Sequence, residues 1–434
     1  MTREVTFRFA LDPTRAQAQM LSAHAGAARF AFNHHIARVK ANLDQRAAMR
    51  TYGIDEADLT PWLSWSKFSF INEFNAWKNG AAADSPVGDD GARGLAWRGA
   101  VSADVFECAS VDAAQACANF AAARSGDRAG KRVGFPRFKA RHNTTPAFRL
   151  RNRARKGGAQ QIRVAGPKAL RLPTIGEIRV HGCTRKLRRM LAAGRCHLYA
   201  ASLRFERGRW WVCLTGVAAI FHPARHSPKD RHSRPAGLDR GVKTLAVIAD
   251  DHGAVLRVVE GVKALHQAQQ VLRRANKALA RTKPGSSGRR KAKIRLTRVH
   301  ARIAHLRADT AHKLSHWAAT RLTSVTIEDL NVAGMNQLRS LARAVADAGM
   351  GDLGRLLAYK TAWYGCGLHV ADRWFPSSKT CSGCGQVKTD LTLSDRTYRC
   401  AYCGIVLDRD VNAAINLARW PGREQQIAPH TAAA

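Results

Sequence analysis

The chain has 434 residues, 45% of them hydrophobic, which suffices for two or three domains, and it lacks the apolar run of about eighteen residues that a membrane span requires. Its first residues also lack the apolar stretch of a secretory signal, so we expect a cytoplasmic protein. The 71 Lys and Arg residues against 32 Asp and Glu give a net charge of +39, which favours nucleic acid as the partner.

The amino-terminal quarter of the chain is predicted to contain one strand followed by helices. Residues 2–10, "TREVTFRFA", alternate between polar and apolar side chains as a strand does. From Thr14 onward the apolar residues recur at helical spacing, and similar spacing returns over 63–79 and 103–123. We therefore expect a helical domain over 11–125.

The following segment, 126–225, is predicted to form an antiparallel β-domain. The stretch "GKRVGFPRFKARHNTTP" interrupts the helical period with Gly and Pro and is strongly basic. Several alternating runs follow, and the longest, "CHLYAASLRFERGRWWVCLTGVAAI", contains a hairpin turned at "ERGR".

The carboxy-terminal half alternates strands with helices, which indicates an α/β domain. Three strands are predicted over 236–260, and a long basic helical hairpin follows, turned at "KPGSSG". A buried strand in "SVTIEDLNVAGM" ends in Glu328–Asp329, a helix is expected near 352–366, and a last helix begins near "DVNAAINLARW". Residues 423–434 are expected to be a disordered tail.

Four of the ten cysteines form two Cys-x-x-Cys pairs, Cys381 with Cys384 and Cys400 with Cys403. Four thiolates at this spacing can surround one Zn²⁺ ion tetrahedrally, and the glycines beside each pair permit tight turns. Such a shell leaves no open coordination position, so this zinc would be structural. An iron–sulfur site or a redox pair is the alternative.

Three acidic residues stand at the edges of predicted elements in the same half: Asp239, Glu328 and Asp410. Singly, each is explained by a structural role such as a turn or a helix cap. Together, in an α/β domain of a basic protein, they are what phosphodiester hydrolysis requires, because carboxylates hold Mg²⁺ and two such ions clamp the attacking water and the leaving oxygen. We expect all three to be catalytic Mg²⁺ ligands.

With these motifs the sequence resembles the transposon-encoded TnpB proteins, RNA-guided DNA endonucleases related to the miniature type V CRISPR effectors. The resemblance extends over nearly the whole chain and is most specific over 236–418. "GLDRGVKTLAV" is similar to the family's first RuvC motif, "TIEDLNVAGM" to the second, and "FPSSKTCSGCG…YRCAYCGIVLDRDVNAAINL" to the zinc ribbon that leads into the third. More weakly, "LDPTRAQAQMLSAHAGAARFAFN" and "GFPRFK" resemble the amino-terminal half.

Carried over by position, Asp239, Glu328 and Asp410 match the family's catalytic acids, and the four cysteines match its zinc ligands. The family pattern aligns Asp410 with the metal ligand, so Asp408 is expected to be a helix cap or a neighbour of the site. The implied fold is α+β and multidomain. A β-barrel wedge domain comprises 1–10 and 126–225, and a helical recognition domain is inserted at 11–125. An RNase H-like (RuvC) nuclease domain comprises 226–376 and 405–422, with a zinc ribbon at 377–404.

The resemblance also implies partners: a guide RNA, a double-stranded DNA target and its displaced single strand. Basic residues around "GFPRFK" are the candidates for contact with the RNA: Lys131, Arg132, Arg137, Lys139 and Arg141. Their aromatic neighbours Phe135 and Phe138 are expected to be core residues rather than platforms on which bases stack.

Other functions are weighed against this one. A nuclease-inactive protein that occupies DNA through its guide is disfavoured by the presence of all three acids. A transposase that performs strand transfer is disfavoured because the sequence shows no tyrosine or HUH nucleophile motif. A compact CRISPR effector whose guide comes from a CRISPR array stays open, since only the neighbouring DNA distinguishes the two sources.

Overall fold

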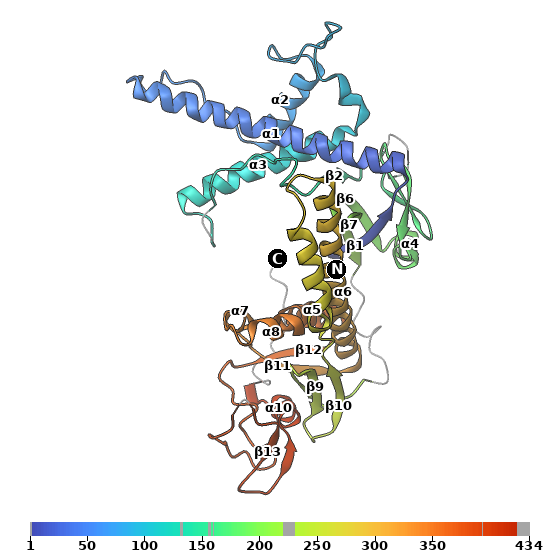
Figure 1. Ribbon diagram of the computed structural model, residues 1–434, viewed down its shortest axis with the longest axis vertical. Helices are drawn as coiled ribbons and strands as arrows, with labels where there is room; N and C mark the ends of the chain where they lie inside the picture. Colours follow the sequence, from blue (N-terminus) through green and yellow to red (C-terminus); the bar gives the residue numbers. More distant parts are fainter. Residues whose placement is uncertain are drawn as a thin grey trace. The chain divides into compact units, whose positions relative to one another are not determined.

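The fold is described from a computed structural model, which covers residues 2–130, 133–154, 158, 160–219, 231–392 and 394–422. The chain divides into two compact units, Met1–Ala219 and Ile220–Ala434. Each unit combines helices with strands, so the expected α+β class is confirmed (Figure 1). Within the described parts of the chain, no helix is long and apolar enough to cross a membrane.

The first unit contains a seven-stranded antiparallel sheet in the order β2-β6-β7-β1-β5-β4-β3. Its strands are β1 (Thr2–Asp12), β2 (Ala147–Arg151), β3 (Arg163–Gly166), β4 (Ala169–Leu172), β5 (Gly176–His181), β6 (Cys196–Glu206) and β7 (Arg209–Ala219). The first strand pairs with β5 on one side and β7 on the other, which places it in the sheet built by residues 147–219. The closed barrel expected above is not found, because the described residues show no pairing between the end strands β2 and β3.

The hairpin predicted at "ERGR" joins β6 to β7 through a two-residue loop. Glu206 pairs directly with Arg209, and the two residues between them, Arg207 and Gly208, both have positive φ angles, of 56° and 77°. Two successive residues of positive φ are the signature of a type I′ turn, whose twist matches that of the flanking strands.

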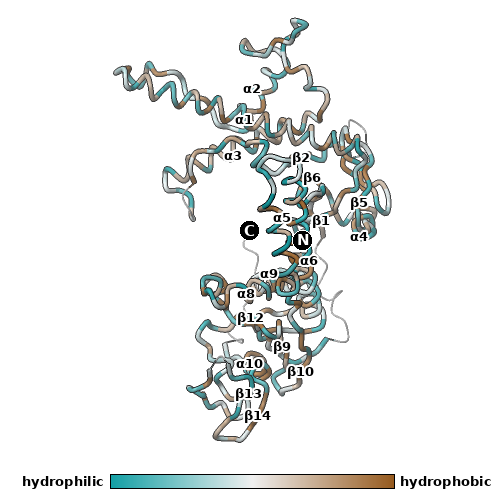
Figure 2. Tube along the Cα trace, in the orientation of Figure 1, coloured by the Kyte–Doolittle hydropathy of each residue, from teal (hydrophilic) through white to brown (hydrophobic). Residues whose placement is uncertain are grey.

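Three main helices accompany this sheet: α1 (Arg15–Thr51), α2 (Lys67–Asn79) and α3 (Ala103–Ser125). The hydroxyl of Thr14 accepts the backbone N–H of Gln17, whose side chain in turn accepts the N–H of Thr14, and this capping box starts α1. Helix α3 packs on α1, α2 and β2. Figure 2 shows hydrophilic and hydrophobic residues interleaved along α1.

Among the described residues, the first unit also contains two shorter helices, the 3₁₀ turn η1 (Ala96–Ala100) and α4 (Arg185–Ala192). Helix α4 is not anticipated by the sequence analysis. Its apolar contacts are Leu187 and Met190, which are three residues apart and buried, while the positions between them carry basic side chains. Eight residues are too short a stretch for the spacing of their apolar side chains to separate a helix from a loop.

The second unit contains a mixed five-stranded sheet in the order β10-β9-β8-β11-β12. Its strands are β8 (Ala236–Asp239), β9 (Thr244–Asp250), β10 (Val255–Glu260), β11 (Ser324–Glu328) and β12 (Gly367–Ala371). The first three form an antiparallel meander, whereas β8, β11 and β12 run parallel. A separate two-stranded ribbon joins β13 (Thr397–Arg399) to β14 (Val406–Asp408).

Helices cover both faces of this mixed sheet. The unit's helices are α5 (Ala264–Ala280), α6 (Ser287–Arg321), α7 (Val332–Met335), α8 (Ala342–Ala348), α9 (Met350–Tyr364) and α10 (Arg409–Ala418). Ala236 and Leu238 of β8 share a buried cluster with residues of α6 and α9. On the other face, Val247 and Ala249 of β9 pack against Ala414 and Ile415 of α10. Because side chains alternate along a strand, Gly237 and Asp239 face α10.

Candidate functional site

Asp239 and Glu328 end two adjacent parallel strands. The register of β8 and β11 pairs Val325 with Ala236 and Ile327 with Leu238. The next residue on each strand is Asp239 and Glu328, so both carboxylates leave the sheet at the same edge, with their strands about 4.8 Å apart. The structure therefore brings together two of the acids that the sequence analysis selects, although 88 residues separate them in the chain.

The third acid, Asp410, reaches the same place because α10 lies directly on the backbone of β8. A Cβ atom at Gly237 would overlap the carbonyl oxygen of Ala414 and lie 2.5 Å from the backbone nitrogen of Ala418. Only glycine permits this approach. Asp410 lies four residues before Ala414, about 6 Å along α10, and Asp239 lies two residues beyond Gly237, about 6.6 Å along β8. Asp410 and Asp239 occupy these matched positions.

A second glycine agrees with this placement. A Cβ atom at Gly241, two residues beyond Asp239, would lie 3.9 Å from Oδ2 of Asp410. Asp408 has a different role, because its Oδ1 accepts the backbone N–H groups of Asp410 at 2.8 Å and Val411 at 3.2 Å. Asp408 is thus the N-cap of α10, as expected, and its carboxylate is committed to the helix end.

The electrostatics of the acids reflect their proximity. Burial raises the pKa of Asp239 well above its usual value, and the negative charges of Glu328 and Asp410 raise it further. Burial also raises the pKa of Asp410, and the neighbouring Asp408 adds to the effect. Carboxyl groups so placed ionise at a cost that a bound cation would offset, and oxygen donors of this kind suit Mg²⁺.

A hydrogen-bonded loop, 376–382, connects Glu328 to α10 and was not anticipated by the sequence analysis. The buried Ser377 donates its hydroxyl to Oε1 of Glu328 at 2.5 Å. Asn416 of α10 donates to the carbonyl oxygens of Ser377 at 2.8 Å and Thr380 at 2.6 Å. One turn earlier, Asn412 donates to Thr380 at 2.7 Å and accepts the backbone N–H of Ser382 at 2.9 Å. The buried side-chain amides of Asn412 and Asn416 thus fix the loop whose Ser377 hydrogen-bonds to Glu328.

A buried arginine, Arg240, contacts the end of β11 at Glu328. Its guanidinium donates to the carbonyl oxygen of Glu328, and a Cβ atom at Gly354 would lie 2.8 Å from its Nη1. Burial lowers the pKa of Arg240, while the charges of Glu328 and Asp239 counteract that effect. Arg240 directly follows Asp239, and its guanidinium lies beside Gly354 of α9, on the face of the sheet opposite α10.

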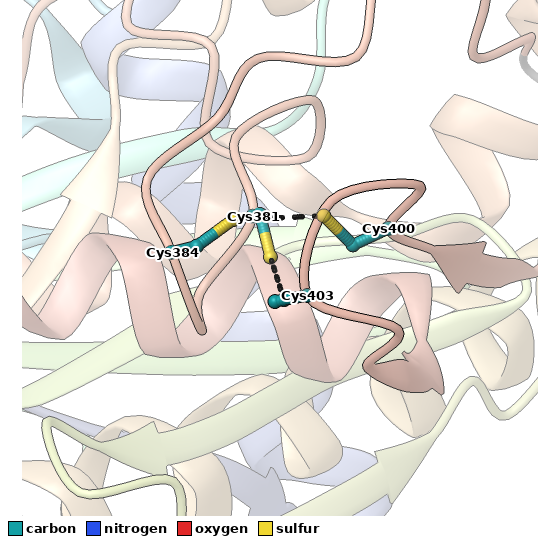
Figure 3. A group of neighbouring side chains, drawn as sticks. All are labelled: Cys381, Cys384, Cys400 and Cys403. Atoms are coloured by element: carbon teal, nitrogen blue, oxygen red, sulfur yellow. Dashed lines mark hydrogen bonds between the residues drawn. The ribbon is translucent and has the colours of Figure 1, made fainter.

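The four cysteines converge on one point just before α10 (Figure 3). Their Sγ atoms lie 3.6 Å apart between Cys381 and Cys403 and 3.6 Å apart between Cys384 and Cys400, and all four lie within 4.8 Å of one another. A tetrahedral Zn²⁺ shell with bonds of about 2.3 Å has edges of roughly 3.8 Å, so the quartet fits this ion. The backbone N–H of Cys403 lowers the pKa of Cys400 to about 6, whereas burial and the neighbouring thiols raise the pKa of Cys384 to about 12 and also raise that of Cys403, so a metal ion would displace protons from the quartet as it binds.

In the described parts of the chain, this quartet is the one group of three or more His, Cys, Asp and Glu side chains close enough to hold a metal without rearrangement. The acidic trio does not form such a group. Its three side chains lie at one edge of the sheet, but their carboxylate oxygens are not all close enough to ligate one ion without rearrangement.

The structure divides the predicted RNA-contact residues. Lys131 and Arg132 lie outside the described residues. Arg137 and Arg141 are exposed, whereas the ammonium of Lys139 lies 3.5 Å from the centre of the Phe32 ring and its backbone is held by Asn33. Lys139 is therefore engaged within the fold, and burial lowers its pKa.

The two aromatic residues of this stretch also differ. Phe135 packs edge-on against Phe120 with their ring centres 5.5 Å apart, as expected of a core residue. Phe138 is 51% exposed, so the expectation that it belongs to the core is wrong.

Lys139 also borders a cavity of about 800 Å³ in the first unit, whose basic lining residues are Arg8, Arg29, Lys139, Arg149 and Arg204.

Three family models match the chain. The model described as "Helix-turn-helix domain" matches residues 1–47, "Probable transposase" matches 220–339, and "Cas12f1-like, TNB domain" matches 351–417. Among solved structures, the chain is similar to the protein in a cryo-EM structure of a Cas12f1–sgRNA–target DNA complex. The TM-score is 0.51 at 11% identity, over 96% of this chain and 99% of that one. The chain therefore shares the compact, type V-like α+β fold of that protein.

Sequence relatives define the family. A protein of Mycobacterium tuberculosis named "Putative RNA-guided DNA endonuclease" is 34% identical over 98% of this chain and 88% of its own length. A TnpB-like protein of Acanthamoeba polyphaga mimivirus is 28% identical over 46% of this chain and 40% of its own length. The chain belongs to the TnpB family.

Proposed function

We propose that this chain is an RNA-guided DNA endonuclease that hydrolyses phosphodiester bonds of guide-matched DNA with Mg²⁺. The observation that carries the proposal is the convergence of Asp239 and Glu328 at the ends of adjacent parallel strands, with Asp410 brought to them by α10. The names of its relatives, which mention RNA guidance and DNA endonuclease activity, agree with this chemistry.

In this proposal Asp239, Glu328 and Asp410 hold Mg²⁺ through carboxylate oxygens. The bound ions would supply the clamp on the attacking water and the leaving oxygen. The chain's own contribution is geometry: Ser377 orients the Glu328 carboxylate, and the contact between Gly237 and Ala414 aligns Asp410 with Asp239. Burial and the charges of Glu328 and Asp410 raise the pKa of Asp239, and a bound cation would favour its ionised form.

The finer domain assignments belong to the same proposal. The mixed sheet order β10-β9-β8-β11-β12, with acids on β8, β11 and α10, supports an RNase H-like (RuvC) nuclease domain. The cysteine quartet, with its tetrahedral spacing, supports a structural zinc ribbon inserted before α10. The sheet of the first unit would be the wedge domain, and α1, α2 and α3 the helical recognition domain.

The guide RNA is proposed to bind basic surfaces of the first unit, including the exposed Arg137 and Arg141. Lys139 is removed from the direct contacts, because its ammonium is held against Phe32. A basic surface that neutralises many phosphates binds with a strong dependence on salt. We therefore expect RNA affinity to fall steeply between low and moderate salt concentration.

The test of this function uses the full chain purified with the RNA that accompanies it. Sequencing that RNA identifies the guide segment. Linear DNA that matches the segment, flanked by randomised sequence, is then incubated with Mg²⁺. Cleavage of matched DNA next to one preferred flanking motif supports the proposal. Binding of matched DNA without cleavage would instead favour a nuclease-inactive binder, and cleavage that ignores the guide would reject RNA guidance.

A further inference from the structure

The turn that follows β12 leaves one tryptophan almost entirely in solvent. The side chain of Trp374 is 89% exposed, whereas the next residue, Phe375, packs against Ala371, Leu417 and Trp420. Tryptophan has the largest apolar surface of all residues, and a chain normally buries most of it. The turn thus directs one aromatic ring into the core and its neighbour away from it.

This turn is held at several points. The backbone N–H of Phe375 donates to Asp372 at 3.0 Å, and that of Ser377 donates to Phe375 at 2.8 Å. Arg373 forms an ion pair of 2.5 Å with Asp329, the residue that follows Glu328. Both residues that flank Trp374 are therefore tied to the folded unit. A ring carried on such a turn has few backbone conformations to lose when a ligand binds.

The turn also lies beside the acidic trio. Ala371 stands opposite Glu328 in the register of β11 and β12, and Ser377 donates to the Glu328 carboxylate. Trp374 is three residues from each of them, which a chain spans in at most about 11 Å. A stacked nucleic-acid strand covers that distance in about three nucleotides, at roughly 3.4 Å each.

We infer that Trp374 is a stacking platform for one nucleobase of the DNA strand whose phosphate reaches Asp239, Glu328 and Asp410. This inference rests on the proposed nuclease function. Every base has a π-face, so an exposed indole binds single-stranded DNA with little sequence preference. By stacking one base, Trp374 would place the strand so that a fixed phosphate lies at the acids.

The test replaces Trp374 in the full chain purified with its RNA. Trp374→Ala removes the ring, Trp374→Leu keeps apolar bulk without a π-face, and Trp374→Phe keeps a smaller one. Thermal melting checks that each variant folds, which the exposure of the side chain leads us to expect. With single-stranded DNA that matches the guide, we expect kcat/KM to fall by roughly 5- to 150-fold for Ala and Leu, mainly through KM, and by much less for Phe.

A scan with abasic sites identifies the partner. Substrates that each lack one base are cleaved by the wild-type protein and by Trp374→Ala. In the wild type, loss of one base within about three nucleotides of the cleaved phosphate should reproduce the defect of Trp374→Ala. The same abasic substrate should cause no further loss in the variant, because the two partners of one contact are not additive. Equal losses at every position in both proteins would overturn the inference.

A binding assay separates this inference from the nuclease function. In an Asp239→Ala background, the same oligonucleotides carry 2-aminopurine at the position found by the scan, or at successive positions if the wild-type protein does not cleave. If the fluorescence of 2-aminopurine is quenched on binding to protein that has Trp374 but not to Trp374→Ala, stacking is supported even if the cleavage proposal fails. Unchanged DNA binding together with weakened RNA binding would assign the ring to the guide and overturn the inference, and so would loss of neither.

Discussion

The hydroxyl of Ser377 donates a hydrogen bond of 2.5 Å to Oε1 of Glu328, and the carbonyl oxygen of the same serine accepts from Asn416. One residue of the loop before the cysteine quartet therefore contacts both the end of β11 and helix α10. This contact links the elements that carry two of the acids, Glu328 and Asp410.

Ser377→Ala should weaken Mg²⁺ use without unfolding the protein. A hydrogen bond to a charged group contributes about 1.5–3 kcal/mol, so its loss should reduce the cleavage rate by roughly 10- to 100-fold at limiting Mg²⁺. Raising the Mg²⁺ concentration should restore part of the rate, and Ser377→Thr, which keeps the hydroxyl, should retain most of it. A Mg²⁺ titration of the cleavage rate measures this. An unchanged midpoint in Ser377→Ala would show that the contact does not position Glu328.

Gly237→Ala should separate α10 from the sheet. The added methyl group would overlap the carbonyl oxygen of Ala414, and relieving such overpacking costs about 1–3 kcal/mol or more. We expect a lower melting temperature and a large loss of cleavage, since Asp410 moves with the helix. Gly26→Ala is the matched control, because a Cβ atom in that helix meets nothing within 4 Å. Equal stability of the two variants would contradict the proposed close approach.

Zinc removal should destabilise the second unit. Ligand binding at the quartet is coupled to folding, so Cys381→Ser or Cys403→Ser should lower stability and activity together. Cys183→Ser, at an exposed and isolated cysteine, is the control. Elemental analysis should find one zinc per chain in active protein. If well-folded, fully active protein contained far less than one zinc ion per chain, a structural zinc would be ruled out.

Acid should destabilise the first unit through buried His35. Burial lowers the pKa of His35 to about 3, and the side chain stacks on Phe70 and bonds to Ser110. In the unfolded chain His35 takes up a proton near pH 6.5, whereas in the folded chain it stays neutral down to about pH 3. Its contribution to the free energy of unfolding is therefore complete above pH 6.5 and is lost progressively as the pH drops toward 3. The slope is at most about 1.4 kcal/mol per pH unit for this residue.

Denaturant unfolding of residues 1–219 within the full chain, followed at several pH values, measures this slope. His35→Gln should reduce it, whereas replacement of the exposed His142 should not. An unchanged slope in His35→Gln would show that His35 does not carry the linkage.

Much of the fold follows from short-range patterns in the sequence. The alternation in "CHLYAASLRFERGRWWVCLTGVAAI" and its turn predict the β6–β7 hairpin, and helical spacing predicts α1 and α3. The predicted helix over 63–79 begins later, because Ser66 accepts the N–H of Ser69 and starts α2 there. The open edges of the seven-stranded sheet could not be predicted, because closure depends on the pairing of strands that are distant in sequence.

The candidate site shows the same division. Asp239, Glu328 and Asp410 are visible in the sequence because each stands at the edge of a recognisable element. Ser377 is a serine in a polar loop, and its partner is 49 residues away, so no periodicity marks it. Arg240 looks like one more basic residue in a basic chain until its burial and its contact with Glu328 are known.

Mutation of the acids tests the central claim most directly. Asp239→Ala, Glu328→Ala, Asp410→Ala and the double variants are purified with their RNA, and binding and Mg²⁺-dependent cleavage of matched DNA are measured. We predict that every single variant loses cleavage, that double variants lose no more, and that DNA binding persists, because the acids act as one unit on metal rather than on the guide. Asp408→Ala, which removes the helix cap, should retain more activity than Asp410→Ala. Cleavage by Asp239→Ala at near the wild-type rate would contradict the account.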